Sequence, residues 1–520
     1  MLSRITSHRF YQSLCTLLLA LVLMGLPLTS VPFLTRATGV LVAPFSILPL
    51  FVLVLIWLIP YLLRRGSFPK EMTAIFYFVI VVVISSAAAY FLDGFYMRGR
   101  TYFGQSLRAL FTLAIGLSFY VTLSAYLRQR SVLQQAMLFI YIGGMGLILW
   151  SVMEIIVLHR FGSVQNFPAW LTRIKSVLVF QQPGMLFTNR LTALAYEPSW
   201  YVLIFTLVLF PLWLSAVFQR KSLFSIKLWR FIVEDILLLA GMTVFMFSFP
   251  RIGLLALIVM LLYFGIQLTR RLFGKIHAWL INHKRFKVGD TTLFRTVLTL
   301  ALVTLTLIIL ISSAAIFIKI ASQQDARFQL IIDLFSTKAF KELPTSETDI
   351  ILFSRGLAFM ERTIYWFGGW RIFADYPFGV GLGNAGFYMV DRINSLGYGS
   401  FEVRNILYQS TSLMNIKSLW IRLLAETGFI GLSVYLTWLY LLWRNSTFIQ
   451  KSDDTLLQIV GMAGKFFVLA YLIEGFSVDT FTFPYPWVTA SLISAGSLIM
   501  RKEIQSRRPI VANSAKHSSF

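Results

Sequence analysis

The amino-acid sequence predicts an all-α polytopic membrane protein. Of its 520 residues, 57% are hydrophobic and only 13% are charged, and the mean hydropathy is +0.74. A soluble globular domain carries about 25% charged residues. The apolar residues also form long runs, many near the ~20 residues that a helix needs to cross a bilayer. We therefore expect about twelve transmembrane helices and a large, mainly helical loop on one side.

The apolar runs set the predicted boundaries to within a few residues. The first run is too long, and too poorly equipped with a small-residue cleavage site, to be a removable signal peptide, so we interpret it as a span. The predicted spans lie near residues 12–33, 42–63, 72–92, 107–126, 133–158, 200–218, 231–248, 252–268, 296–319, 418–443, 456–474 and 481–500.

Basic residues predict the orientation of these spans. Lysine and arginine clusters fall between the runs on one side, which is then cytoplasmic and holds both termini. The formal net charge of +24 is spread over these clusters, so we interpret it as a topogenic signal and expect no nucleic-acid partner. The predicted regions are 1–158 with helices 1–5, the exterior loop 159–199, 200–319 with helices 6–9, the large exterior loop 320–416, 417–500 with helices 10–12, and a basic cytoplasmic tail, 501–520.

Within the large loop, residues 328–340 and 348–375 have helical spacing, and Pro377 with the glycines after it ends the second helix. The run Gly379–Gly383 resembles a glycine-rich nucleotide loop, but it follows no predicted strand. We interpret it as a backbone turn.

Cysteine and histidine are too scarce to build a redox or metal centre. Cys15, which lies in the first apolar run, is the only cysteine, and of the five histidines only His159 is near the exterior face. We expect no metal and no cofactor.

Arginine is unexpectedly frequent in the exterior loops, where a positive-inside bias disfavours it. Its planar guanidinium binds phosphate with two charge-assisted hydrogen bonds and stays ionised when partly desolvated, so these arginines favour an anionic, phosphate-bearing ligand. Solvated loop residues are the alternative interpretation, weakest for two that adjoin spans, Arg190 and Arg251.

A second group of candidates lies in the predicted loop helix. Arg355 and Arg362 are seven residues apart, which places both on one face of a continuous helix. Trp366 shares that side, where it would hold a sugar ring beside a phosphate or simply pack, and Arg371 and Asp375 follow on the same helix.

Glu197 stands out among the exterior acids. Pro198 favours the first turn of a helix, so Glu197 would occupy the N-cap, where the helix dipole stabilises the carboxylate. Burial at the membrane entrance would instead raise its pKa toward the range of a general base. Helix capping alone is the other interpretation. The remaining candidate acids are Glu361, Asp375, Asp391, Glu402, Asp479 and, deeper in a span, Glu426.

Three blocks of this sequence resemble the bacterial O-antigen polymerase and O-antigen ligase superfamily of glycosyltransferases. They are Arg190–Ser199 with its Glu-Pro-Ser, Arg362–Trp366 followed by Pro377–Asn384, and Leu423–Leu432, with a looser fourth at Ser248–Gly253. The resemblance covers about residues 190–435. Where ligases of the family typically have a His-Asn pair, this chain has Lys417-Ser418.

The resemblance implies a polysaccharide polymerase of the bacterial inner membrane. It would join undecaprenyl-pyrophosphate-linked oligosaccharide repeats at the periplasmic face, among membrane lipids, with a chain-length regulator and a flippase as partners. Arg190, Arg251, Arg355 and Arg362 would bind pyrophosphate, Trp366 and Arg371 would contact substrate, and Glu197 would be the base, with Asp375 next. A ligase shares every block. A flippase is the alternative of another class, and the few mid-span charges, chiefly Arg422, Glu426 and Lys465, argue against it.

Overall fold

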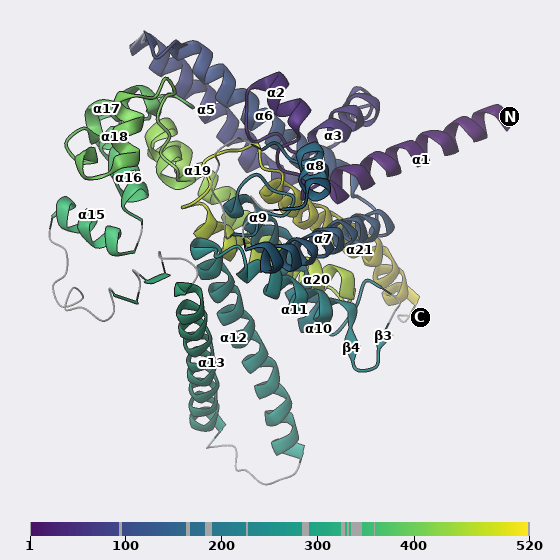
Figure 1. Cartoon of the computed structure of the whole chain (residues 1–520). Helices are drawn as coiled ribbons and strands as arrows, with labels where there is room; N and C mark the ends of the chain where they lie inside the picture. Colours follow the sequence, from purple (N-terminus) through teal and green to yellow (C-terminus); the bar gives the residue numbers. More distant parts are fainter. Residues whose placement is uncertain are drawn as a thin grey trace. The chain divides into compact units, whose positions relative to one another are not determined.

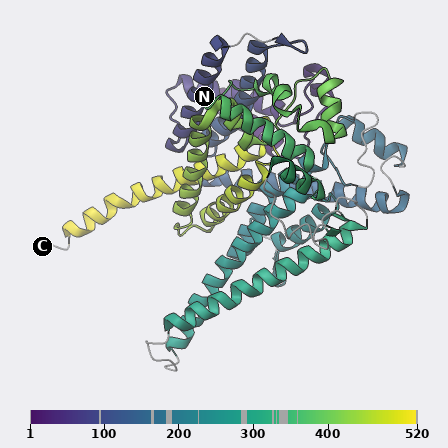
Figure 2. The same ribbon diagram turned by 90° about the vertical axis from the view of Figure 1, so that its left-hand side faces the viewer.

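The computed structural model describes residues 2–92, 96–162, 167–181, 190–224, 227–282, 291–323, 328–329, 332–333, 346–357 and 359–517. The chain divides into two compact units. The first comprises Met1–Pro250 and Glu361–Phe520, and the second is Arg251–Met360. Nearly all the secondary structure is helical (Figures 1 and 2), which confirms the all-α class over these ranges.

The first unit contains most of the helices. They are α1 (Leu2–Met24), α2 (Pro32–Thr38), α3 (Ile47–Leu53), α4 (Ile59–Leu63), α5 (Thr73–Leu92), α6 (Tyr102–Tyr126), α7 (Arg130–Phe161), α8 (Ala169–Leu178), α9 (Pro198–Ile204), α10 (Phe210–Gln219), α11 (Val233–Met246), α16 (Met360–Asp375), α17 (Ala385–Ile393), α18 (Phe401–Tyr408), α19 (Leu419–Ile449), α20 (Thr455–Glu474) and α21 (Tyr485–His517). Short π-helices, Val54–Leu58 and Phe205–Leu209, join α3 to α4 and α9 to α10.

Strands are limited to two small antiparallel hairpins in the described residues. The pair β1 (Tyr96–Met97) and β2 (Arg100–Thr101) precedes α6, and the pair β3 (Lys227–Leu228) and β4 (Phe231–Ile232) precedes α11.

The second unit is built on two long helices. These are α12 (Arg251–Asn282) and α13 (Thr291–Ser322), which lie side by side (Figures 1 and 2), and α15 (Glu347–Gly356) follows them.

Every predicted span overlaps at least one helix, but the count of twelve is not confirmed. Seven helices in the described residues are long and apolar enough to cross a membrane, and three further apolar helices are shorter. With a rise of about 1.5 Å per residue, the 14-residue α11 is too short for a hydrocarbon core of about 30 Å. The seven are Lys70–Phe91, Tyr102–Tyr126, Arg130–Phe161, Pro198–Gln219, Arg251–Leu272, Leu419–Ile449 and Thr455–Glu474.

The core of the first unit lies where α6, α19, α20 and α21 pack together. Aromatic side chains fill this core. Among them, Trp438 and Trp487 are completely buried, and their ring centroids are 5.5 Å apart. One pair of hydroxyl groups within this core is hydrogen-bonded, since Tyr120 Oη lies 2.8 Å from Ser494 Oγ. Paired hydroxyls avoid the cost of burying an unsatisfied polar group.

The prediction of one continuous helix over 348–375 is wrong. Helix α15 ends at Gly356 and α16 begins at Met360, and the backbone N–H of Phe359 turns back to the carbonyl of Ser354 at 2.8 Å. The seven-residue spacing therefore does not place Arg355 and Arg362 on one helix face. The predicted helix 328–340 lies mostly outside the described residues.

The prediction of a backbone turn at Gly379–Gly383 is confirmed. All three glycines of this run have positive φ, and Gly379 packs so closely on α19 that a Cβ would lie 2.5 Å from the carbonyl oxygen of Glu426. Helix α19 is itself kinked there, because Gly428 has φ 67° and ψ −173°. Only glycine adopts such a backbone without strain. The second and third family blocks are thus one packed unit.

Candidate active site

Glu197 is the N-cap residue of α9, as the sequence predicts, but its side chain does not cap the helix. Instead, Oε2 accepts a 3.0 Å hydrogen bond from Ser199 Oγ. The fixed φ of Pro198 suits the first helical turn. The carboxylate therefore lies next to the helix N-terminus, but it forms no capping hydrogen bond with a backbone N–H of the helix.

Three contacts hold the segment that leads to Glu197. The backbone N–H of Leu191 donates to the carbonyl of Phe247 at 3.1 Å, and that of Tyr196 donates to Thr29 Oγ1 at 3.0 Å. Thr192 Oγ1 accepts a 2.8 Å hydrogen bond from Lys175 Nζ. The segment is thus attached to α8, to the loop after α1 and to the loop after α11.

Lys175 belongs to a buried ion pair. Its Nζ lies 3.0 Å from Glu154 Oε1 of α7, and the two side chains are 6% and 1% exposed. Trp150 Nε1 donates to the other carboxylate oxygen at 3.2 Å. Because both charges are paired and hydrogen-bonded, their burial is tolerated, and the pair fixes α8 and Thr192 relative to α7.

Five charged residues from separate parts of the chain converge near Glu197. This charged cluster comprises Glu197 before α9, Arg362 of α16, Glu402 of α18, Lys417 before α19, and Asp479 between α20 and α21. Arg362 Nη1 donates to the carbonyls of Lys417 at 3.2 Å and Ser477 at 3.4 Å, which ties α16 to both neighbouring loops.

Within the charged cluster, burial and the attraction between opposite charges shift the pKa values in opposite directions. Burial raises the pKa of Glu197 above its ordinary value, and Asp479 adds to this, while Lys417 and Arg362 act in the other direction. Burial likewise raises the pKa of Asp479 against the effect of nearby cations. Burial lowers the pKa of Arg362, which Asp479 and Glu197 counteract. Carboxyls with raised pKa next to fixed cations are characteristic of catalytic sites.

Lys417 occupies a strained and highly connected position. Its backbone has φ 55°, and its Nζ forms an ion pair with Glu402 and lies 4.8 Å from the ring centroid of Tyr365. Tyr365 Oη also donates to Glu402 at 3.3 Å. A non-glycine residue in the left-handed region marks a place where the surrounding structure imposes the conformation. The charged cluster therefore holds the Lys417 cation in a position that its surroundings fix.

A second group of buried charged residues adjoins the charged cluster. Arg422 donates from Nε to Glu426 at 2.9 Å and also to the carbonyl of Asp479. Glu474, at the end of α20, accepts a 2.9 Å hydrogen bond from Thr206. These contacts fix the loop that carries Asp479. Glu474 is not among the residues predicted from the sequence, although an acid at the end of an apolar run is a signal.

Trp366 lies one helical turn after Arg362. Its ring packs against Phe476 with centroids 5.5 Å apart, and it is half-buried. Its Nε1 has no hydrogen-bond partner in the described part of the chain. A half-exposed tryptophan ring beside cations is suited to contact a sugar ring.

Two further predicted arginines, Arg190 and Arg371, are engaged with backbone carbonyls. Arg190 donates from Nε to Ser248 at 3.0 Å and from Nη2 to Phe249 at 3.4 Å, which joins the first block to the fourth. Arg371 donates to the carbonyl of Arg392 at 2.7 Å. Both side chains connect segments that are distant in sequence.

Asp375, the predicted second base, is paired away from the charged cluster. Its Oδ2 lies 2.5 Å from Arg392 Nη2, at the opposite end of α16 from Arg362. The structure thus brings together Glu197 and Arg362 but not Asp375.

Arg251 and Arg355 both lie in the second unit. Arg251 begins α12, donates to the carbonyl of Leu357 at 2.8 Å, and lies 4.5 Å from the ring centroid of Phe359. Arg355 is exposed on α15. Arg251 thereby satisfies a carbonyl at the C-terminal end of α15.

No group of three His, Cys, Asp or Glu side chains in the described ranges is arranged as metal ligands.

The family comparison matches the part of the chain that contains these features. Residues 236–436 match the family model described as O-antigen ligase. The matched range includes the second, third and fourth blocks, with Arg362 and Lys417, whereas Glu197 and Asp479 lie outside it. The comparison with curated proteins found no match. The family match therefore confirms the resemblance of this chain to the O-antigen polymerase and ligase superfamily over residues 236–436, which are similar to the O-antigen ligase family model.

Proposed function

We propose that this protein is a polysaccharide polymerase of the bacterial inner membrane that joins undecaprenyl-pyrophosphate-linked oligosaccharide repeats at the periplasmic face. The observation that carries the proposal is the charged cluster, where a partly buried carboxylate interacts electrostatically with an arginine and a lysine. The family match supports a glycan-transferring enzyme. The Glu-Pro-Ser block and the absence of the ligase histidine favour polymerisation.

In the proposed reaction the growing chain is the donor. The hydroxyl of the incoming repeat attacks the anomeric carbon, its oxygen forms the new glycosidic bond, and the bond to the pyrophosphate oxygen breaks. Glu197 accepts the hydroxyl proton, and the electron pair leaves with polyprenyl pyrophosphate. Arg362 and Lys417 stabilise the charge that develops on this leaving group, as preorganised cations do in a transition state.

Other residues support this chemistry. Asp479 replaces Asp375 as the second candidate base, because it shares the charged cluster with Glu197 whereas Asp375 pairs with Arg392. Arg190 would reach the pyrophosphate by exchanging its present carbonyl partners. Trp366 would pack on a sugar ring. Arg371, Arg251 and Arg355 are further proposed substrate contacts, because arginines in the exterior loops favour a phosphate-bearing ligand.

Transfer without a metal ion follows from the same cations. Their positive charge performs the neutralisation that a divalent ion performs in other phosphate-displacing enzymes.

A flippase and a chain-length regulator are proposed partners. Among the mid-span charges, Arg422 pairs with Glu426 at 2.9 Å, and Lys465 donates to Gln450 at 2.6 Å. These internal contacts fit structural roles better than a transport path.

The test is the length of the glycan made in cells. Glu197→Gln and Arg362→Ala should leave folded, membrane-inserted protein but yield single-repeat glycolipid. Matched controls are Asp391→Asn and Arg404→Ala, which remove the same charges from exposed positions of α17 and α18. Normal chain length in both test variants refutes the assignment.

An O-antigen ligase is the second candidate, because the matching family model carries that description. Purified protein supplied with lipid-linked repeats separates the two. A polymerase lengthens the lipid-linked chain, whereas a ligase needs a different acceptor and leaves the length of the lipid-linked chain unchanged.

A further inference from the structure

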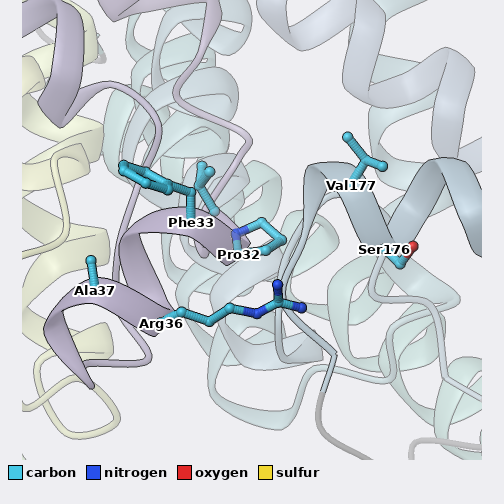
Figure 3. A pocket seen from close by; sticks show the side chains of 7 residues that line it. Pro32, Phe33, Arg36, Ala37, Ser176 and Val177 are labelled. Atoms are coloured by element: carbon cyan, nitrogen blue, oxygen red, sulfur yellow. The ribbon is translucent and has the colours of Figure 1, made fainter.

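An open cavity of about 730 Å³ lies between α2 and α8 of the first unit. Figure 3 shows Arg36 extending from α2 toward α8, with Phe33 and Ala37 on its own helix and Ser176 and Val177 on the other side. None of these residues belongs to the charged cluster, and all lie outside the matched range 236–436. We call this feature the α2–α8 groove.

The rim of the α2–α8 groove is apolar and exposed. Phe33 and Val177 are 72% and 71% exposed, and Trp170 and Ile174 add apolar surface on α8. The opposite side of α8 is anchored by the buried Lys175. A short helix with one anchored face and exposed aromatic and aliphatic side chains on the other is typical of the membrane–water interface.

The charged residue among those that line the α2–α8 groove is Arg36. Residues 1–70 and 155–196, which include both walls, contain no Asp or Glu, and Lys175 on the far side of α8 is neutralised by Glu154. An apolar rim, a guanidinium and the hydroxyl of Ser176 match a ligand with a hydrocarbon chain and a phosphate.

The α2–α8 groove is directly connected to the segment that carries Glu197. The residues just before α2 contact this segment through Thr29 Oγ1, which accepts a hydrogen bond from Tyr196 N–H at 3.0 Å. They also contact the end of α8 through the carbonyl of Ser30, which accepts from Phe180 N–H at 2.7 Å. The rings of Phe180 and Tyr196 also stack, with centroids 6.2 Å apart. A ligand in the groove would therefore lie beside a rigidly attached catalytic segment.

We propose that the α2–α8 groove binds the phosphate end of an isoprenoid-phosphate lipid, the carrier of the second substrate, with Arg36 and Ser176 on the phosphate and Phe33 and Val177 against the chain. The identity of the lipid rests on the proposed function. A polymerase must hold two lipid-linked substrates at once. The charged cluster serves the donor, and the α2–α8 groove serves the acceptor.

The test measures binding of undecaprenyl phosphate to the full-length protein in phosphatidylcholine nanodiscs, in an Arg362→Ala background that removes the charged-cluster arginine. Arg36→Gln and Ala37→Trp should each weaken binding about tenfold or more, the effect of one charge-assisted hydrogen bond or of a filled groove. Arg160→Gln, an exposed arginine outside the groove, is the matched control and should bind as the parent does.

Competition identifies the ligand. Unlabelled undecaprenyl phosphate should displace the probe, whereas equal concentrations of phosphatidylglycerol or inorganic pyrophosphate should not. Displacement by phosphatidylglycerol shows a general anionic-lipid surface and overturns the proposal, as does equal binding by all variants. Because binding needs no turnover, its failure is distinct from failure of the glycan-length test.

Discussion

At the residue scale, the environment of Glu197 determines how activity depends on pH. A general base must be ionised, and burial raises the pKa of this carboxyl above the ordinary value of 4.5. Activity should therefore rise with pH through a midpoint above 4.5. Lys417 lowers the same pKa, so Lys417→Met should move the midpoint to higher pH. The measurement is initial rate against pH for purified protein.

A midpoint that stays unchanged in Lys417→Met would assign the base to another group.

The raised pKa of Glu197 also affects the stability of the protein. Between the ordinary and the raised pKa the folded state binds more protons than the unfolded state, so the contribution of Glu197 to stability falls as pH rises through that range.

At the element scale, the Glu154–Lys175 pair joins α7, α8 and the segment before Glu197. Removing one partner leaves a buried charge unpaired, which costs about 3–5 kcal/mol. Glu154→Gln or Lys175→Met should therefore lower the thermal midpoint in detergent strongly, and the double variant should recover part of the loss. Arg220→Gln, which breaks the more exposed Arg220–Asp235 pair, should change it little. Additive effects in the double variant would show that the two residues do not act as a pair.

Helix existence was predictable at this scale, while helix continuity was not. The apolar periodicity predicts α5, α6, α7 and α20 closely, because an apolar run must be helical to satisfy its backbone in a membrane. The break between α15 and α16 was missed, since Thr348–Asp375 keeps helical spacing across it. The end of α15 is marked by a local turn, in which Phe359 N–H donates to the Ser354 carbonyl, and hydrophobic spacing carries no signal for such a turn.

At the scale of the whole molecule, the predicted orientation can be tested directly. Twelve spans is an even number and places both termini on the cytoplasmic side, whereas an odd number separates them. A fluorescent protein fused after Phe520 should fluoresce, and alkaline phosphatase inserted after Lys341 should be active, because that enzyme needs the periplasm. Activity of alkaline phosphatase fused after Phe520 would place the C-terminus in the periplasm and contradict the predicted orientation.

The sequence by itself determined the helical class, the turn at Gly379–Gly383 and the N-cap position of Glu197. Each depends on neighbours within a few residues, where hydropathy, glycine and proline act directly. The sequence also contained the family blocks later matched over 236–436.

Only the tertiary structure decided which charges meet. Glu197 and Asp479 are far apart in the chain, and their effect on each other depends on how α9, α16, α19 and α20 pack. Asp375 and Arg362 share one helix, yet only Arg362 faces the charged cluster, while Asp375 pairs with Arg392. Spacing along one helix predicts a face, but the neighbours of that face come from distant segments, so the composition of the site follows from packing.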